Sequence, residues 1–356
     1  LGARLGRAAS PHLSKSYPAL IVGLMVLGVA LAFLMPSSLG RAAVLVPVGM
    51  ALADTLGLER GSTGRTGVAV IIALGSNMPG FAILPSNIPN LILAGMAQGT
   101  LGTHIGYGHY LLLHFPVLGV LKSLVIVLLV LRLFPASLAP APVQGTREPL
   151  TLRQIVLMVL LGVTLVLWST DRLHGINPAW IGLGTALILM IPQFGFVGPA
   201  KFREATDFAT LLFVAGALAL GTVVNDSGLG TRLSAALFAA LPLSEGQDLL
   251  NFAALTVLAA VTSLFTTIAG APAVLTPLAP QLAQSTGFSL EAVLMSQVMG
   301  FSSALFPYQI TPLIVAMGLA GESTRALVRV TFALCAITLV ALMPLQFLWW
   351  KVLGVL

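Results

Sequence analysis

Charged residues are scarce in this sequence. Only 8% of the 356 residues are Asp, Glu, Lys or Arg, whereas 57% are hydrophobic and the mean hydropathy is +1.01. Soluble domains carry about a quarter charged residues, so the chain lacks the polar surface that would keep it in water. The apolar segments are long runs rather than short alternating ones, which excludes a membrane β-barrel. The composition therefore predicts an all-α polytopic membrane protein.

Cysteine and intramembrane acid clusters are also missing. Cys335 is the single cysteine, which excludes an intramolecular disulfide. The 11 acidic residues lie almost wholly in loops or at segment ends, and the sequence shows no GxxxxGK[ST] motif for ATP. A membrane-embedded enzyme needs clustered His, Asp, Glu or Cys inside its spans, and His104, His109 and His114 are spaced too widely for a compact metal site. We therefore predict no catalytic residue and no metal site.

Two short motifs occur twice, in the same order. The pattern GxxAVLxP occupies 40–47 in "LGRAAVLVP" and 270–277 in "AGAPAVLTP". Each copy is followed by a proline-containing segment, "IPNLILAGMA" with Pro89 and "TPLIVAMGLA" with Pro312. Corresponding interrupted segments in two halves indicate the binding site of a transporter. The recurrence predicts a duplicated unit, made of a hairpin tip followed by a proline-broken helix.

The apolar segments around these motifs are paired, and several are shorter than the roughly 20 residues that a membrane span needs. The pairs are 17–36 with 41–56, 67–79 with 88–98, 250–265 with 271–285, and 287–307 with 312–320. Irregular backbone at membrane depth is tolerated where it lines a cavity or is buried in protein. We therefore expect re-entrant hairpins at 17–56 and 250–285.

The basic residues predict the topology. If the first hairpin enters from the cytoplasm and the second from outside, only Arg172, Arg232 and Lys351 of the loop Lys and Arg residues fall outside. Such an asymmetry is what the positive-inside rule describes. It predicts a cytoplasmic N-terminal segment in the plasma (inner) membrane, and two halves of opposite orientation. The basic residues are topology signals in loops, so we expect no nucleic-acid partner.

These motifs resemble the divalent anion/sodium symporter family, solute carrier family 13, within the ion transporter superfamily. Its hairpin tips carry Ser-Asn-Thr, and each following helix breaks at a Thr-Pro-Pro-Asn-like turn. Here the tips are "SSLGRAAVLVP" and "TIAGAPAVLTP" and the turns are "NIPN" and "ITPL", so the motifs are degenerate and both tip asparagines are replaced. The resemblance implies an elevator-type transporter, a homodimer, Na⁺ as a coupling ion, and scaffold helices preceding this N-terminally incomplete chain.

The resemblance, together with a Pro-rich connector, divides the chain. The first part of a transport domain is predicted at 1–136, with the cytoplasmic-side hairpin, the broken helix and a following span. A cytoplasmic linker is predicted at 137–153 and scaffold spans at 154–245. The second part of the transport domain, with the outer-side hairpin, is predicted at 246–356.

The candidate site lies at helix N-termini, which present unpaired N–H groups and about half a positive charge to an anion. The predicted substrate-binding residues are Ser37, Ser38, Gly40, Arg41, Asn87, Pro89, Asn90, Thr266, Thr267, Gly270, Tyr308, Gln309, Thr311 and Pro312. Backbone carbonyls of the same turns can coordinate a cation. The predicted cation ligands are Ser37, Ser38, Ser86, Thr267 and Ile310.

Arg41 admits three interpretations. An ionisable side chain at membrane depth is a functional hypothesis by default. Its guanidinium could bind the anion bidentately, or occupy the space of a coupling cation and give an exchanger or uniporter, or snorkel or pair with a carboxylate such as Asp54. Lys122, inside "VLGVLKSLVIV", is expected to pair within the bundle rather than contact substrate.

The predicted function is secondary-active transport of small anions, dicarboxylate or sulfate-like, by an elevator mechanism with cation coupling or anion exchange. The alternatives are another permease of the superfamily or an exporter of a different solute, and, less favoured, a membrane-embedded enzyme. The expected partners are the small anion, the lipid bilayer and a second copy of the chain. No cofactor is expected other than Na⁺ as a coupling ion.

Overall fold

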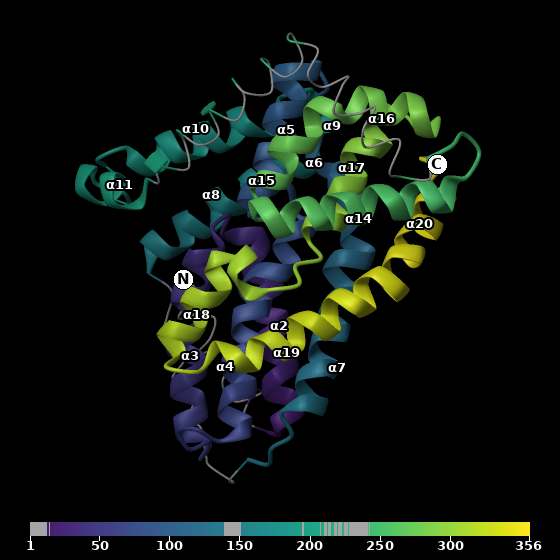
Figure 1. Cartoon of the computed structure of the whole chain (residues 1–356). Coiled ribbons are helices and arrows are strands. Elements are labelled where there is room, and N and C mark those ends of the chain that lie inside the picture. Colours follow the sequence, from purple (N-terminus) through teal and green to yellow (C-terminus); the bar gives the residue numbers. More distant parts are fainter. Residues whose placement is uncertain are drawn as a thin grey trace.

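The computed structural model is built from helices in the part of the chain that it describes (Figure 1). It describes residue 13, residues 15–138, 151–193, 196–206 and 243–356, and scattered positions between 208 and 241. The predicted linker and the later scaffold spans therefore lie largely outside the described residues, as do Arg147 and Arg232. Five described segments are long and apolar enough to cross a membrane: Tyr17–Leu34, Tyr107–Leu133, Leu152–Ser169, Asp248–Thr266 and Thr324–Val352.

The first half begins with a helical hairpin followed by an interrupted helix. The hairpin consists of α2 (Tyr17–Leu34) and α3 (Ser38–Thr55), and the interrupted helix of α4 (Thr63–Asn77) and α5 (Ile88–Leu101). Two 3₁₀ turns, Met78–Ala82 and Leu84–Ser86, lie between α4 and α5. Prolines at the start of each turn and of α5 lack the N–H that a continuous helix needs.

The second half repeats this order of elements. Its hairpin is α14 (Asp248–Thr266) followed by the helical run α15 (Gly270–Leu275), η4 (Thr276–Leu278) and α16 (Ala279–Thr286). Its interrupted helix is α17 (Leu290–Phe301) and α18 (Thr311–Ala320). The irregular segment between them spans 302–310 and includes a 3₁₀ turn, Pro307–Gln309.

Helix α17 ends at Phe301, so the second interruption begins earlier than the predicted apolar segment 287–307 indicated. Ser302 and Ser303 both donate from their hydroxyls to the Met299 carbonyl, at 3.1 and 2.7 Å. Serine side chains that bond to nearby backbone compete with the helical pattern. The Gln309 side-chain oxygen then accepts the N–H groups of Leu305 and Phe306, which fixes the irregular backbone after the helix.

Helices α2 and α4 run parallel and approach closely. The Tyr17 hydroxyl donates to the Gly64 carbonyl at 3.1 Å near the start of both helices. Near their ends, a Cβ added to Gly28 would lie 2.4 Å from the Gly75 carbonyl oxygen. The pair therefore depends on a glycine at the crossing, and it brings the first tip to the same end as the first interruption.

Helices α14 and α17 have the same relation. Asn251 donates from its amide to the carbonyl of Thr286, just before α17 begins, at 3.2 Å. Further along both helices, a Cβ added to Gly300 would lie 2.4 Å from the Thr256 carbonyl oxygen. The second tip is thereby brought to the second interruption.

The two halves pack across each other. Helix α18 of the second half lies against α3 and α4 of the first, and α5 of the first half lies against α15 and η4 of the second (Figure 1). Ile92 and Met96 of α5 are fully buried beside Ala269 and Ala273 of the second tip. Each half thus contributes the second part of its broken helix to the hairpin of the other.

A long helix follows each interrupted helix, and each contains a π-helical segment. In the first, α6 (Tyr107–His114) leads through η3 (Phe115–Leu121) into α7 (Lys122–Leu133). In the second, α19 (Thr324–Ile337) leads through η6 (Thr338–Leu342) into α20 (Met343–Val352). Pro116 has no N–H for the Leu112 carbonyl four residues earlier, and Trp349 of α20 donates to that carbonyl at 2.9 Å.

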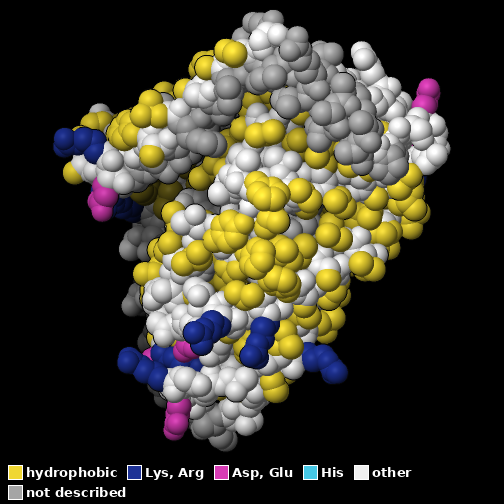
Figure 2. Space-filling model, in the orientation of Figure 1, with side chains coloured by type: hydrophobic (Ala, Val, Ile, Leu, Met, Phe, Trp, Pro, Cys, Tyr) yellow, Lys and Arg dark blue, Asp and Glu magenta, His cyan; other side chains and the backbone are white. Residues whose placement is uncertain are grey.

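The described part of the predicted scaffold is loosely packed. It contains α8 (Leu152–Ser169), α9 (Asp171–His174), α10 (Pro178–Met190) and α11 (Pro199–Ala205). Of the α8 side chains only Thr164 and Trp168 are buried. Figure 2 shows hydrophobic side chains covering much of one face, while Lys and Arg gather at its lower end and over α11. Such an apolar surface is suited to lipid or to another polypeptide.

Candidate functional site

The first tip, residues 35–37, is shaped by two serines with different roles. Ser37 is exposed and caps α3, its hydroxyl accepting the Gly40 N–H at 3.1 Å. Ser38 is buried and donates to the side-chain oxygen of Asn87, at the start of α5. The tip is therefore joined directly to the first interruption.

Arg41 completes this junction with every N–H of its guanidinium. The side chain is fully buried, at 0% exposure. Its Nε donates to the Ser76 carbonyl at 2.6 Å, Nη1 donates to the Met35 carbonyl and to Ser86 Oγ (2.8 Å), and Nη2 donates to Ser38 Oγ (3.0 Å) and the Ser86 carbonyl (3.2 Å). Because a guanidinium has five donors, none is left for an anion in this conformation.

Asp54, named above as one partner for Arg41, pairs instead with Arg65. The Arg65 side chain is buried and also lies 3.6 Å from Glu322, at the end of α18. Thr66 donates to the same Glu322 carboxylate at 2.8 Å. These contacts form an ion-pair cluster that joins α3, α4 and α18 away from the tips, so they leave Arg41 with carbonyl and hydroxyl partners.

The amides of the first interruption point inward. Asn87 donates to the Asn77 carbonyl at 3.3 Å. Asn90 donates to the Gly80 and Ile83 carbonyls at 2.9 and 3.0 Å, and its own side-chain oxygen is buried with no partner among the described residues. Pro89 lies buried between these two asparagines in the first turn of α5. The predicted polar residues of this turn therefore hold the turn itself together.

The second tip, residues 266–269, keeps its polar groups at the surface. Thr266 and Thr267 are both exposed. Thr267 has φ +76° and ψ 166°, and it is the one non-glycine residue with positive φ among those described. This backbone region is essentially restricted to glycine and costs about 1–3 kcal/mol for other residues. A Cβ added to Gly270 would lie 2.7 Å from the Thr266 Cβ, so this position needs glycine.

Gln309 is the link between the second tip and the second interruption. Its side-chain oxygen accepts the N–H groups of Leu305 and Phe306 at 2.9 and 2.8 Å, and its amide donates to Ser263 at 3.1 Å. The Gln309 carbonyl in turn lies 3.5 Å from the Ile268 N–H of the tip. A neutral amide therefore fills the bridging role that a cation has in the first half.

The other predicted residues of the second interruption divide into exposed and buried ones. Tyr308 is half exposed and donates to the Leu264 carbonyl at 2.6 Å. Ile310 is fully buried, and its carbonyl accepts the Leu313 N–H at 2.9 Å. Thr311 is exposed and Pro312 partly exposed in the first turn of α18. The predicted site residues thus form two clusters, one at each tip and interruption, which α5 and α18 hold against each other.

Two more polar side chains lie near the second interruption: Lys122, which was expected to pair within the bundle, and Gln297, which sequence reasoning missed. The Lys122 ammonium group donates to the Ser302 carbonyl at 2.6 Å and contacts Ser302 Oγ at 3.3 Å. The Gln297 side chain is buried, with neither amide atom partnered within the described structure. A lone polar residue in an apolar run was the available signal for both. The partner of Lys122, however, comes from a distant part of the chain and cannot be deduced from local spacing.

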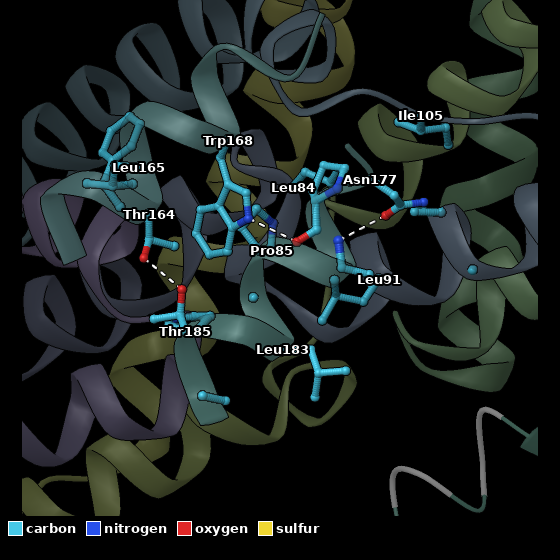
Figure 3. Close-up of a pocket in the computed structure, with 18 of the residues that line it drawn as sticks. Leu84, Pro85, Leu91, Ile105, Thr164, Leu165, Trp168, Asn177, Leu183 and Thr185 are labelled. Atoms are coloured by element: carbon cyan, nitrogen blue, oxygen red, sulfur yellow. Dashed lines mark hydrogen bonds between the residues drawn. The ribbon is translucent and has the colours of Figure 1, made fainter. Parts of the chain in front are cut away.

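A cavity of about 630 Å³ lies between the first half and the described scaffold (Figure 3). Pro36, Leu84 and Pro85 line it on one side, and α8 and α10 line it on the other. Its scaffold polar groups are mostly paired, with Thr164 bonded to Thr185 at 2.8 Å and the Trp168 indole donating to the Pro178 carbonyl at 3.0 Å. This largely apolar lining does not suit an anion.

Comparisons with known proteins agree with this architecture. Over 99% of its length the chain is 22% identical to a protein described as a membrane protein from Cupriavidus necator, of which it covers 71%. Its fold is similar to that in the crystal structure of the YdaH transporter of Alcanivorax borkumensis. The two share a TM-score of 0.61 and 17% identity, over 99% of this chain and 85% of that one.

A family model identifies the chain more closely. The model described as "sodium:sulfate symporter transmembrane region" matches residues 2–356, which is almost the whole sequence. The resemblance to divalent anion/sodium symporters is thereby confirmed. The chain is a membrane protein that belongs to the sodium:sulfate symporter family of transporters.

Proposed function

We propose that the chain is a secondary-active transporter of small divalent anions, dicarboxylate or sulfate-like. The observation that carries this proposal is the mutual packing of two tip-and-interruption units, α5 against α15 and α18 against α3. Secondary transporters bind their substrates near the bilayer midplane, at discontinuous helices where the two repeats meet. The packing places the two interrupted helices, one from each half, in contact with each other.

The repeats are proposed to be inverted, with the hairpins re-entrant. The parallel pair of α2 and α4 has its counterpart in α14 and α17, and both long spans that follow contain a π-helical segment. We propose that the two units move together against the scaffold in an elevator mechanism. The apolar cavity beside α8 and α10 supports this, because it is a boundary with few polar links. The exposed apolar face of α8 supports a homodimer that shields it.

The anion is proposed to bind on the second-tip side of the joined units. There the hydroxyls of Thr266, Thr267 and Thr311 are carried by exposed residues. Both α5 and α18 begin without a side-chain cap, so the positive ends of these two helix dipoles are not covered by a capping side chain and suit an anion. Ser37 contributes from the first tip, while Ser38, Asn87 and Arg41 hold that tip in place.

The test is uptake by the purified protein in proteoliposomes. We expect labelled succinate or sulfate to accumulate, driven by either an ion gradient or preloaded anion. Gly270→Ala should strongly reduce uptake, because the added Cβ displaces Thr266. Gly318→Ala is the matched control, since an added Cβ there meets nothing within 4 Å. Uptake of neither anion under any gradient, by a folded protein, would favour a permease or exporter of a different solute.

The orientation of the two halves has its own test. On a Cys335→Ser background, Arg60→Cys labels the loop between α3 and α4, and Gln247→Cys labels the base of the second hairpin, both exposed. The proposal expects an impermeant thiol reagent to reach Gln247→Cys from outside intact cells. Arg60→Cys should react only after the plasma membrane is opened. Labelling of both from the same side would contradict inverted halves.

A further inference from the structure

A buried cation lies at the end of the helix that precedes each interruption. Helix α4 ends at Asn77, and the Arg41 Nε donates to the Ser76 carbonyl at 2.6 Å. Helix α17 ends at Phe301, and the Lys122 ammonium donates to the Ser302 carbonyl at 2.6 Å. Arg41 reaches its helix end from the neighbouring hairpin, and Lys122 reaches its own from α7. Both cations therefore come from the first half of the chain, and each lies at the end of the helix that precedes one of the two interruptions.

The hydrogen-bond acceptors of both cations are oxygen atoms without formal charge. The guanidinium of Arg41 contacts three backbone carbonyls and two serine hydroxyls, and the ammonium of Lys122 contacts the carbonyl and hydroxyl of Ser302. Within the described residues, neither cation forms a salt bridge with a carboxylate. Both side chains are almost fully buried, at 0% and 1% exposure.

The position itself attracts a cation. The last carbonyls of a helix lack intrahelical donors and carry about half a negative charge. In secondary transporters, unwound carbonyls and the C-terminal ends of half-helices are the groups that coordinate a coupling Na⁺ or H⁺. Carbonyl and hydroxyl oxygens are also the ligands that hard cations prefer. In this chain the carbonyls at the two helix ends already accept hydrogen bonds from Arg41 and Lys122. These side chains are part of the chain and, unlike a bound ion, cannot dissociate.

We propose that Arg41 and Lys122 are resident cations that fill both coupling-cation positions, so that anion transport by this chain does not require sodium. The inference rests on the proposed function and sharpens it: movement of the anion is balanced by anion exchange or proceeds as uniport. Arg41 and Lys122 are positioning residues in this scheme. They neutralise the helix ends and hold each interruption open for the anion on its other side.

The first experiment measures thermal melting of the purified protein in detergent, in NaCl and in choline chloride at equal ionic strength. We expect the wild-type Tm to be the same in both salts. Lys122→Ala should melt at a higher temperature in NaCl than in choline chloride, because the vacated site admits a small cation. Arg41→Ala should be stabilised by millimolar guanidinium, which the wild type is not. Arg60→Ala, exposed in the loop after α3, is the control and should respond to neither cation.

Two results would overturn the proposal. A wild-type Tm raised by Na⁺ over choline would overturn the proposal, because it would show a sodium site that remains open. Folded Arg41→Ala and Lys122→Ala variants that respond to no added cation would also overturn it. If these variants do not fold, Arg41→Lys and Lys122→Arg retain the charge and should fold without a sodium response. The comparison of the wild-type Tm in NaCl and in choline chloride tests the proposal even if none of the variants folds.

Uptake separates this inference from the proposed function. In proteoliposomes preloaded with succinate or sulfate, replacing external Na⁺ by choline should leave the rate of labelled anion entry unchanged within twofold. Entry that falls more than tenfold without Na⁺ would overturn the inference and leave the anion transporter standing. Absence of entry for both anions in both salts would instead contradict the proposed function, and the melting comparison would still test the resident cations.

Discussion

At the first tip, Arg41 reaches back into the fold and takes Ser38, Ser86 and three carbonyls as partners, whereas the second tip has Ala271 at the matching place in the repeated motif. The second tip relies on Gln309, a neutral side chain that belongs to the interruption rather than to the hairpin. Its threonines stay exposed, and one has a strained backbone. The first tip is therefore held by an internal cation and buried polar groups, whereas the threonines of the second tip lie at the surface.

This difference explains how a degenerate repeat can divide its tasks. A buried guanidinium needs acceptors in every direction of its fork, so placing one at the first tip draws the nearby hydroxyls and carbonyls inward. The second hairpin carries no such cation: Thr266 donates to the Thr262 carbonyl of its own helix at 2.8 Å, and both Thr266 and Thr267 are exposed. We expect substitutions at the first tip to change stability, and substitutions at the second tip to change interaction with the anion.

The largest expected effect is on stability at the two bridging side chains. Arg41→Met should lower the free energy of unfolding by about 3 kcal/mol or more, because it leaves several buried acceptors without donors. Gln309→Met should lower it by about 1–2 kcal/mol, since fewer and uncharged bonds are lost. Arg60→Met, on an exposed side chain, should stay within about 0.5 kcal/mol. Denaturant titration in detergent measures all three. Equal losses at Arg41 and Gln309 would remove the contrast between the tips.

The second-largest expected effect is on stability at the close helix crossings that both halves share. Gly28→Ala and Gly300→Ala each place a Cβ about 2.4 Å from a backbone oxygen of the neighbouring parallel helix. Each should cost about 1–3 kcal/mol. Gly95→Ala and Gly162→Ala are matched controls, because an added Cβ meets nothing within 4 Å. They should be neutral or stabilising by up to about 1 kcal/mol. A control that destabilises as much as Gly28→Ala would argue against close crossings as the cause.

A smaller effect is expected from the strained backbone of the second tip. Thr267→Gly should raise the free energy of unfolding by about 1 kcal/mol, because glycine adopts this φ and ψ without a steric penalty. Ser37→Gly at the first tip should change it by only a few tenths of a kcal/mol, as for other capping residues. Melting temperatures of the two variants beside wild type make the measurement. A destabilised Thr267→Gly would show that the threonine side chain contributes more than its backbone costs.

The smallest change is in the chemical reactivity of the tips. On a Cys335→Ser background, we expect succinate or sulfate to slow thiol labelling of Thr267→Cys several-fold. Ser37→Cys should be protected less, although both positions are exposed, because Ser37 lies at the edge of the proposed site and its hydroxyl oxygen already accepts the Gly40 N–H. The rate of labelling with and without anion provides the comparison. Stronger protection of Ser37→Cys would place the anion at the first tip instead.

Much of the fold could be predicted from sequence because the interruptions are marked locally. The expected arms 17–36 and 41–56 correspond to helices ending at Leu34 and beginning at Ser38. Proline interrupts a helix and glycine destabilises it, so the positions of these residues indicate where the helices break. The start of the second interruption was misplaced because Ser302 and Ser303 lie in an apolar run and act through their bonds to Met299.

The contacts of the site could be predicted only in part. Arg41 stood out because a charge at membrane depth is rare, but no spacing rule shows that Ser76 and Ser86 supply its acceptors. Lys122 was expected to pair inside the bundle, and its partner Ser302 is 180 residues away in the chain. The choice between a residue that binds ligand and one that braces the protein depends on such long-range contacts.

The docking of α20 on the first half has a consequence for biogenesis. The Leu112 carbonyl receives its donor from Trp349, and the Leu113 carbonyl receives donors from Gln346 and Trp350. Both tryptophans are translated more than two hundred residues after those carbonyls. These hydrogen bonds can therefore form only after α20 has been translated, and until then the span that contains Pro116 lacks them. Packing of the first half thus depends on a helix that is translated more than two hundred residues later.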